Sequence, residues 1–379
     1  MSPPRPTLYL DWNATAPLRP QARAAMLAVL DAPGNPSSVH GAGRKARDLV
    51  ERARTRVAAL AGAATDRLVF TSGGTEANAL ALRALFDDVD VLLVSAIEHD
   101  AVLQTARAGP VPVEVWPVTA DGLADLDWLA TRLRRGDRAA AALMLANNET
   151  GVIQPVAEAG ALLRAAGGRL HVDAVQAAGK IAVDLAALGA DTLALSAHKL
   201  GGPQGAGALA FAAEVRPTPL WRGGGQEQGL RPGTENVAAI AGFGAAAQAA
   251  RAALPDASAQ AAWRDAAAVR LKAAGARIMG EAAPRLPNTL CLAAPGWPSD
   301  RQVMWLDLGG VQVSAGAACS SGKVRPSPVL EAMGQGALAP FALRASGGYD
   351  TDPSHWSAFA DLWLDGYARV TARQRTEVA

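Results

Sequence analysis

The chain has 379 residues and a mass of 38.8 kDa, which is too long for one compact core and suits two or three domains. Half of the residues are hydrophobic and 19% are charged, so the composition excludes wholesale disorder. The 36 basic and 35 acidic residues leave a net charge of +1, which argues against a surface devoted to nucleic acid or to an anionic membrane.

The sequence shows no sign of export or of membrane insertion. Its two cysteines, Cys291 and Cys319, are too few for a disulfide framework. The apolar stretch before Asp11 is too short for a signal peptide, and the charge-free residues 237–250 are too short and weakly apolar to span a bilayer. We therefore expect a soluble, cytoplasmic protein with no membrane or nucleic-acid partner.

Short apolar runs of strand length alternate with helical stretches along the first two thirds of the chain. Strands are expected at residues 68–70, 91–94, 113–116, 141–145, 170–172 and 192–195, and helices at 77–85, 125–135 and 157–166. This alternation predicts an α/β domain with a mostly parallel sheet covered by helices on both faces.

The rhythm changes at residues 222–233, which are rich in Gly and Pro. An Ala-rich helix is expected next, at residues 235–254, and Pro255 closes it. Further strands are expected at 289–293 and 312–314. We predict a large domain of residues 15–255 and a smaller α+β domain of residues 1–14 and 256–379.

Polar residues gather where the predicted strands end. The clusters are Thr71 to Thr75, Glu98-His99, Asn147 to Glu149, Asp173 with Gln176, and Ser196 to Lys199. In open parallel sheets the ligand site lies off the carboxyl ends of the strands, so these clusters should converge on one pocket.

The cluster from Thr71 to Thr75 runs from a strand through two glycines into a helix. Free backbone N–H groups and the helix dipole suit such a turn to an anion, although a lone Gly-Gly pair is more often a plain tight turn. No lysine follows the glycines, so this is not a Walker loop, and the spacing is not that of a dinucleotide turn.

Lysine is rare here, since only five of the 36 basic residues are Lys. Lys199 at a strand end is suited to Schiff-base chemistry because burial lowers the pKa of an amine; alternatively it is a solvated strand-end lysine. Asp173 could keep a pyridine nitrogen protonated, and His99 could stack on such a ring and move protons. His171 and His355 look structural.

An imine-forming lysine, a carboxylate for a pyridinium and an anion site for a phosphate together specify pyridoxal 5'-phosphate (PLP). The same groups fit a nicotinamide or a nucleotide less well. No His, Cys and Asp grouping has the spacing of metal ligands, so no resident metal is expected.

The two cysteines have different surroundings. Cys291 lies in an apolar strand and is most simply a core residue. Cys319 lies among small residues and glycines, with Lys323 and Arg325 following, so a mobile loop and a favoured thiolate are expected. A harmless surface thiol is the alternative, but beside a PLP site the loop suggests a nucleophile that travels between substrate and acceptor.

Taken together, these motifs resemble the cysteine desulfurases, specifically the IscS and NifS group of the class V aminotransferase family. The resemblance runs in order from about residue 9 to 348, and its stretches are 9–15, 34–40, 70–76, 98–99, 147–151, 171–176, 196–199, 231–236 and the Ala-Ala-Cys-Ser-Ser-Gly loop at Cys319. It implies PLP fold type I, the aspartate aminotransferase-like fold.

The resemblance also implies a role for each matching residue. Lys199 would hold PLP, His99 would stack on its ring and act as acid and base, and Cys319 would take sulfur from L-cysteine as a persulfide and leave alanine. The remaining cofactor contacts would be Gly74, Thr75, Ser196, His198 and Thr234 at the phosphate, Asp173 at the ring nitrogen, and Gln176 and Asn148 at the ring hydroxyl. Arg344 would bind the substrate carboxylate, with help from Asn13 and Asn148.

The implied partners follow from these roles. Thr234 would reach over from the second subunit of a homodimer with a shared active site. The sulfur would pass to an acceptor such as an iron–sulfur scaffold protein, with at most a transient iron–sulfur contact at Cys319.

Three positions depart from the family pattern. Trp12 stands where Asn is common, and Ala345 and Gly347 replace larger apolar residues around Arg344, which could loosen its seating. Three functions are therefore weighed: a cysteine desulfurase, a related PLP enzyme such as an aminotransferase or selenocysteine lyase, and an inactive scaffold. Cys319 argues against the second, and the retained polar groups argue against the third.

Overall fold

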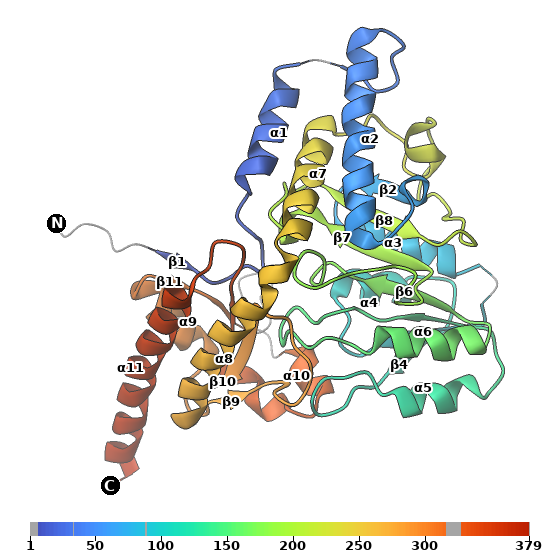
Figure 1. Ribbon diagram of the computed structural model, residues 1–379. Helices are drawn as coiled ribbons and strands as arrows, with labels where there is room; N and C mark the ends of the chain where they lie inside the picture. Colours follow the sequence, from blue (N-terminus) through green and yellow to red (C-terminus); the bar gives the residue numbers. More distant parts are fainter. Residues whose placement is uncertain (1–6, 33, 88, 316–326, 379) are drawn as a thin grey trace.

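The computed structural model describes residues 7–32, 34–87, 89–315 and 327–378. It contains a large seven-stranded sheet, a smaller four-stranded sheet and a two-stranded one, and both ends of the described chain lie on the side of the four-stranded sheet (Figure 1).

The large sheet has the strand order β2-β8-β7-β6-β5-β3-β4. β8 runs antiparallel to both of its neighbours and the other strands all run in one direction. The strands are β2 (Leu68–Thr71), β3 (Val91–Ser95), β4 (Val113–Trp116), β5 (Ala139–Ala142), β6 (Arg169–Asp173), β7 (Thr192–Ser196) and β8 (Gly207–Phe211). The expected mostly parallel sheet is confirmed.

Helices cover both faces of this sheet because alternate strand residues point to opposite sides. Leu93 packs in one cluster with α2 (Gly41–Ala61), α5 (Leu126–Leu133), α6 (Val156–Ala165) and α7 (Val237–Ala252). Its neighbours Leu92 and Val94 pack on the other face with α3 (Gly74–Leu85) and α4 (Asp100–Arg107). α1 (Pro20–Leu30) packs on α7 beside α2 (Figure 1).

The smaller part contains the antiparallel sheet β12-β13-β10-β9, formed by Ser314–Ala315, Ala342–Ser346, Thr289–Ala293 and Arg277–Ile278. β1 (Leu8–Tyr9) pairs in parallel with β11 (Val311–Gln312). Around them lie α8 (Ala257–Ala273), α9 (Ser299–Leu308), α10 (Pro328–Ala332) and α11 (Pro353–Val378). Leu10 packs in this core, so the start of the described chain joins its end.

Short 3-10 helices complete the path: η1 (Thr65–Arg67), η2 (Ala197–Lys199), η3 (Gln226–Gly229), η4 (Leu254–Asp256) and η5 (Gly336–Phe341). The predicted domain boundary at residue 255 lies within η4. An apolar cluster containing Ile97 and Met144 from the large sheet's edge and Cys291 and Leu330 from the smaller part joins the two.

Three expectations about strands differ from the structure. The strand expected at 141–145 lies at Ala139–Ala142, and β8 was not expected. The strand expected at 312–314 is split into β11 and β12, which belong to different sheets. Beyond the end of β5 at Ala142, the N–H groups of Leu143 and Leu145 still donate hydrogen bonds to the carbonyls of His171 and Asp173 on β6. The chain therefore continues alongside β6 after the regular strand ends.

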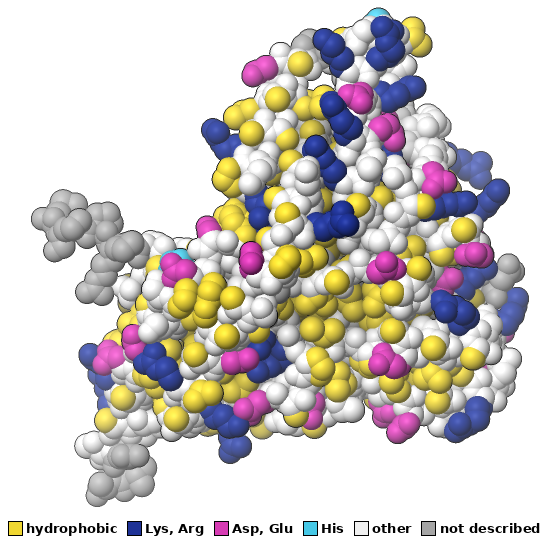
Figure 2. Space-filling view, viewed as in Figure 1, with side chains coloured by type: hydrophobic (Ala, Val, Ile, Leu, Met, Phe, Trp, Pro, Cys, Tyr) yellow, Lys and Arg dark blue, Asp and Glu magenta, His cyan; other side chains and the backbone are white. Residues whose placement is uncertain are grey.

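Within the described part of the chain no single helix is long and apolar enough to cross a membrane. The helices Val237–Ala252 and Leu254–Ala273 are together long and apolar enough to span a membrane, but they are bent by 48° where they meet. Charged side chains of both signs are interspersed over the face seen in Figure 2.

Candidate active site

The predicted polar clusters do share one edge of the large sheet. Because β2, β3, β5, β6 and β7 run in the same direction, their carboxyl ends all point to one side. Thr71, Asp173 and Ser196 are the last residues of their strands. The smaller sheet contributes Arg344 from β13, so the site lies where the two parts of the molecule meet.

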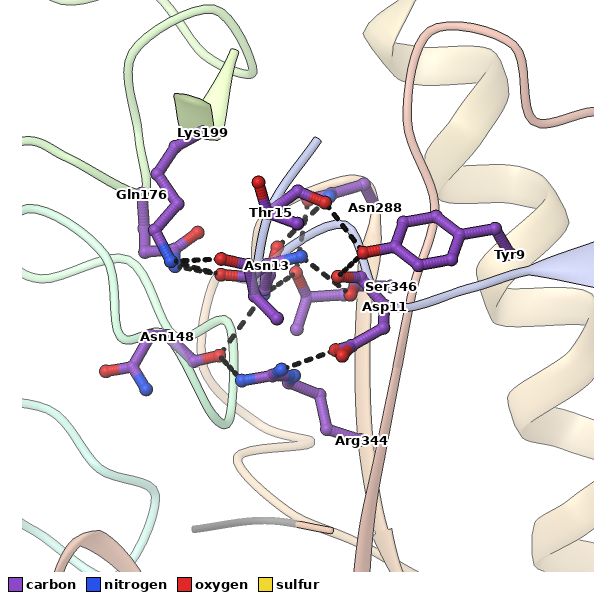
Figure 3. A network of polar contacts seen from close by, with 12 residues as sticks. Tyr9, Asp11, Asn13, Thr15, Asn148, Gln176, Lys199, Asn288, Arg344 and Ser346 are labelled. Carbon is purple, nitrogen blue, oxygen red and sulfur yellow. Dashed lines mark hydrogen bonds and ion pairs between the residues drawn. The ribbon is translucent and has the colours of Figure 1, made fainter. Parts of the chain in front are cut away.

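Asn13 is the hub of the site (Figure 3). Its backbone carbonyl accepts hydrogen bonds from Lys199 Nζ at 2.6 Å and from Gln176 Nε2 at 2.9 Å. Its side-chain Nδ2 donates to the carbonyl of Asn148 and to Thr289 Oγ1. Its Oδ1 accepts from Lys180 Nζ and Asn288 Nδ2.

Both ends of the Asn13 amide are therefore fully used, since a primary amide has two donor protons and two acceptor lone pairs. The predicted contact of this side chain with substrate stays a prediction. It would require the amide to exchange one of these partners.

Lys199 stands in η2, directly after β7, and donates a second hydrogen bond to the carbonyl of Ala14 at 2.9 Å. Burial, followed by the charge of the nearby Arg344 guanidinium, lowers the pKa of Lys199 to about 8. A larger fraction of the amine is consequently neutral near pH 7 than for a solvated lysine, which is the form that attacks a carbonyl.

Lys180 was not predicted as a site residue. Its Nζ donates to Asn13 Oδ1 at 2.9 Å and to Gln176 Oε1 at 2.7 Å. Burial, followed by the charge of Lys199, lowers the pKa of Lys180 well below its ordinary value. The rarity of lysine was the signal in the sequence that could have found it.

Lys180 also fixes the orientation of Gln176. Because Oε1 faces the lysine, the Nε2 group faces Asn13 and the side of Lys199. One Nε2 proton is used by the Asn13 carbonyl, and the other is available to donate to an anionic oxygen such as a ring hydroxylate.

A cradle for an anion lies at the amino end of α3. A side chain at Gly73 would meet open space, and a Cβ at Gly74 would come within 3.5 Å of the Ser196 Cβ. Thr75 is in the first turn of the same helix. The free N–H groups at this end and the neighbouring Ser196 hydroxyl therefore suit a phosphate.

Two predicted site histidines follow the strands β7 and β3. His198 Nδ1 lies 3.2 Å from Thr15 Oγ1, and burial lowers the pKa of His198 to about 4, so the ring is neutral. His99 caps the amino end of α4, where its Nδ1 accepts a hydrogen bond from the Ala101 N–H at 3.0 Å. The proton of a neutral His99 ring is thus on Nε2, which is exposed for proton transfer.

Arg344 is 3% exposed and is held at two points. Its Nη2 pairs with Asp11 Oδ1 at 2.6 Å and its Nη1 donates to the carbonyl of Asn148 at 3.0 Å. Its Nε is buried without a hydrogen-bond partner in the described part of the chain. Asp11 lay in a matching motif but was not predicted as a site residue.

The Asn148 side chain points away from this cluster (Figure 3), so it is placed to contact something other than Asn13 and Arg344. Thr234 is exposed in the single chain, before the start of α7. Cys319 lies outside the described residues. Cys291 is fully buried in β10, and burial raises the pKa of its thiol to about 12, so the expected core residue is confirmed.

The Trp12 departure is accommodated by a glycine. The Trp12 ring meets the Tyr349 ring edge-on at 4.8 Å, and a Cβ at Gly348 would lie 1.9 Å from it. Ala345 is fully buried in β13. Arg344 itself is held by its contacts with Asp11 and Asn148.

These residues fit PLP. A buried amine with a lowered pKa, a carboxylate at Asp173 and a glycine-lined helix end next to Ser196 supply the imine, ring-nitrogen and phosphate partners that PLP needs. Three histidine, cysteine or carboxylate side chains that could hold a metal ion do not come together anywhere in residues 7–315 and 327–378, leaving aside 33 and 88.

The chain is similar to known proteins over most of its length. The aminotransferase class-V family matches residues 8–352. A cysteine desulfurase of Cereibacter sphaeroides is 42% identical over 376 residues, covering 94% of this chain and 92% of that protein. Cysteine desulfurase IscS of Dictyoglomus turgidum is 38% identical over 338 residues, with 86% and 85% covered.

The fold is also similar to that of a solved structure from the same group of proteins. The NifS-like protein of Rickettsia africae superimposes with a TM-score of 0.88 at 32% identity, over 96% of this chain and 99% of the other. The expected PLP fold type I is thereby confirmed. The chain belongs to the aminotransferase class-V family, as a PLP-dependent enzyme of the IscS and NifS group of cysteine desulfurases.

Proposed function

We propose that this enzyme removes sulfur from L-cysteine, leaving L-alanine and a persulfide on Cys319. The observation that carries the proposal is the meeting of the buried Lys199 amine with the Arg344 guanidinium around Asn13 and Asn148. The Lys199 amine can form an imine with PLP, and the Arg344 guanidinium suits the carboxylate of an amino acid substrate.

PLP supplies an electron sink when it is bound. Lys199 would hold the cofactor and then carry protons, for which its lowered pKa suits it. Asp173 would face the ring nitrogen, Gln176 and Asn148 the ring hydroxyl, and Gly74, Thr75, Ser196 and His198 the phosphate. His99 would lie against the ring and donate or accept a proton at Nε2.

The sulfur step would belong to Cys319. Its thiolate would attack the sulfur of the bound cysteine, the bond between that sulfur and carbon would break, and the electron pair would remain with the carbon skeleton. A proton then completes alanine, and the extra sulfur stays on Cys319 until a second nucleophile accepts it.

We further propose a cytoplasmic homodimer in which Thr234 of each subunit completes the phosphate site of the other. The exposure of Thr234 in the single chain supports this arrangement. The acceptor would be a protein thiol, such as one on an iron–sulfur scaffold.

The test combines two measurements on the purified holoenzyme. Alanine and enzyme-bound sulfur should form in equal amounts from L-cysteine, and mass spectrometry should find the added sulfur on Cys319. Cys319→Ala should bind L-cysteine yet form no persulfide, and Lys199→Ala should form neither product. Undiminished persulfide transfer in Cys319→Ala would contradict the proposal, and so would transamination as the main reaction of the wild type.

A further inference from the structure

A continuous line of hydrogen bonds leads from Asp173 into the interior of the large sheet. Asn78 Nδ2 donates to Asp173 Oδ2 at 2.7 Å, His171 Nε2 lies 2.9 Å from Asn78 Oδ1, and His171 Nδ1 lies 3.0 Å from Thr192 Oγ1. Asn78, His171 and Thr192 are each no more than 1% exposed. A buried polar line of this kind is costly unless every member is paired.

The strand geometry explains how the line forms. His171 and Asp173 are two residues apart on β6, so both side chains point to the same face of the sheet. That face is covered by α3, which carries Asn78, whereas Leu170 and Val172 point to the opposite core. Thr192 is the residue paired with His171 on the neighbouring strand β7.

Each proton in the line has one possible position. An ionised carboxylate only accepts, so the Nδ2 group of Asn78 faces Asp173 and its Oδ1 faces His171. His171 must then donate from Nε2. Burial lowers the pKa of His171 to about 4, so the ring is neutral and its Nδ1 accepts from the Thr192 hydroxyl.

Of two neighbouring buried carboxyl groups, Asp173 and Glu98, Asp173 has hydrogen-bond donors to both of its oxygens. Its Oδ1 also accepts from the Val175 N–H at 2.9 Å, so each oxygen has a donor. Glu98 accepts only at Oε1, from the Met144 N–H, and its Oε2 has no partner among the described atoms. Burial raises the pKa of Glu98 well above its usual range, and the nearby Asp173 charge acts in the same direction.

We propose that Asn78 and His171 are positioning residues that orient the Asp173 carboxylate and keep it ionised toward the ring nitrogen of PLP. The inference rests on the proposed use of PLP at Asp173. A phenylalanine at position 171 would fill the same space in the sheet, but only a donor there can hold the Asn78 amide in the orientation that Asp173 requires.

The test measures the protonation state of the PLP ring nitrogen directly. Apoenzyme is reconstituted with PLP labelled with ¹⁵N in the ring, and the nitrogen shift is followed between about pH 6 and pH 9. The wild type should keep the nitrogen protonated throughout. Asn78→Leu and His171→Phe should lower its deprotonation midpoint by about one pH unit or more. His171→Gln, which keeps a donor near the Nε2 position, should behave like the wild type.

One control variant and one fallback pair of variants keep the outcomes separate. His355→Phe makes the same change at a partly exposed histidine on α11 and should leave the shift unchanged. Should Asn78→Leu fail to fold, the pair His171→Phe and His171→Gln decides alone. Unchanged shifts in folded Asn78→Leu or His171→Phe would overturn the inference while leaving the function intact. A wild type that binds PLP with an unprotonated ring nitrogen would also overturn the inference, whereas a wild type that binds no PLP would overturn the proposed function.

Discussion

Lys180 and Lys199 both donate to Asn13, one to its side chain and the other to its backbone. The Lys180 Nζ lies 2.9 Å from Asn13 Oδ1 and the Lys199 Nζ lies 2.6 Å from Asn13 O. Two of the chain's five lysines thus meet at one residue, and only Lys199 was predicted to serve the site.

Replacing Lys180 with methionine should weaken the site without removing a predicted catalytic group. Gln176 Oε1 would lose its buried donor, at about 1–3 kcal/mol for an unpaired group, whereas Asn13 Oδ1 would keep only the hydrogen bond from Asn288. We expect a lower midpoint in urea unfolding and a weaker dissociation constant for PLP. Lys272→Met is the matched control because Lys272 is exposed and pairs with Glu281 at the surface. Equal effects of the two variants would refute this role of Lys180.

Arg344→Lys should raise the KM for L-cysteine by about tenfold to a hundredfold, because a lysine loses the planar fork that binds a carboxylate through two hydrogen bonds. Asp11→Asn should have a smaller effect in the same direction, since it removes the charge that holds Arg344 Nη2. Steady-state kinetics at saturating PLP measure both. An unchanged KM in Arg344→Lys would contradict the carboxylate role.

The capture of PLP by apoenzyme should depend on pH through Lys199. The amine must lose its proton before it attacks, so the rate should rise with pH and level off above about pH 8, where an ordinary lysine would continue to about 10.5. Arg344→Gln removes a charge that lowers the pKa of Lys199, so its midpoint should move to higher pH. Stopped-flow absorbance records both curves. A rate that still rises steeply at about pH 9 in the wild type would count against the lowered pKa.

Glu149 should destabilise the fold at neutral pH. Its Oε2 accepts from the Ser327 hydroxyl at 2.5 Å, yet burial raises the pKa of Glu149 from 4.5 to about 7. Between these values the native state holds a proton that the unfolded state lacks, so stability falls as pH rises from 4.5 to 7. Glu149→Gln should therefore be more stable by up to about 3 kcal/mol above pH 7, with little difference near pH 4.5. Urea unfolding at several pH values measures the gap, and a gap that does not change with pH would exclude this cause.

Subunit mixing tests the shared site. Lys199→Ala dimers and Thr234→Asp dimers should each be nearly inactive, the second because a carboxylate would repel the phosphate. If Thr234 acts across the dimer, a mixed dimer contains one site with both changes and one site with neither. Mixing under exchange conditions should then restore activity toward half of the wild-type level for each hybrid. No recovery in dimers shown to be hybrid would place Thr234 in its own subunit's site.

The sequence allowed the strand-end clusters to be predicted because a parallel sheet brings its carboxyl ends together wherever its strands fall. Asp173 and Ser196 required only that rule. The Asn13 contacts could not be predicted in this way, since they join residue 13 to positions as distant as 288 and 346. His171 was expected to be structural because nothing in its own neighbourhood shows Asn78, which lies 93 residues away. The strand β8 escaped prediction because its Gly-Ala-Leu-Ala-Phe sequence has little β propensity and is set by its neighbours β2 and β7.

The ion pair between Asp11 and Arg344 joins residues 333 positions apart. During synthesis, the large sheet's strands are complete by residue 211, long before Arg344 emerges from the ribosome. The strand-end residues of the proposed cofactor site are therefore synthesised well before the guanidinium that would face the carboxylate of the amino acid.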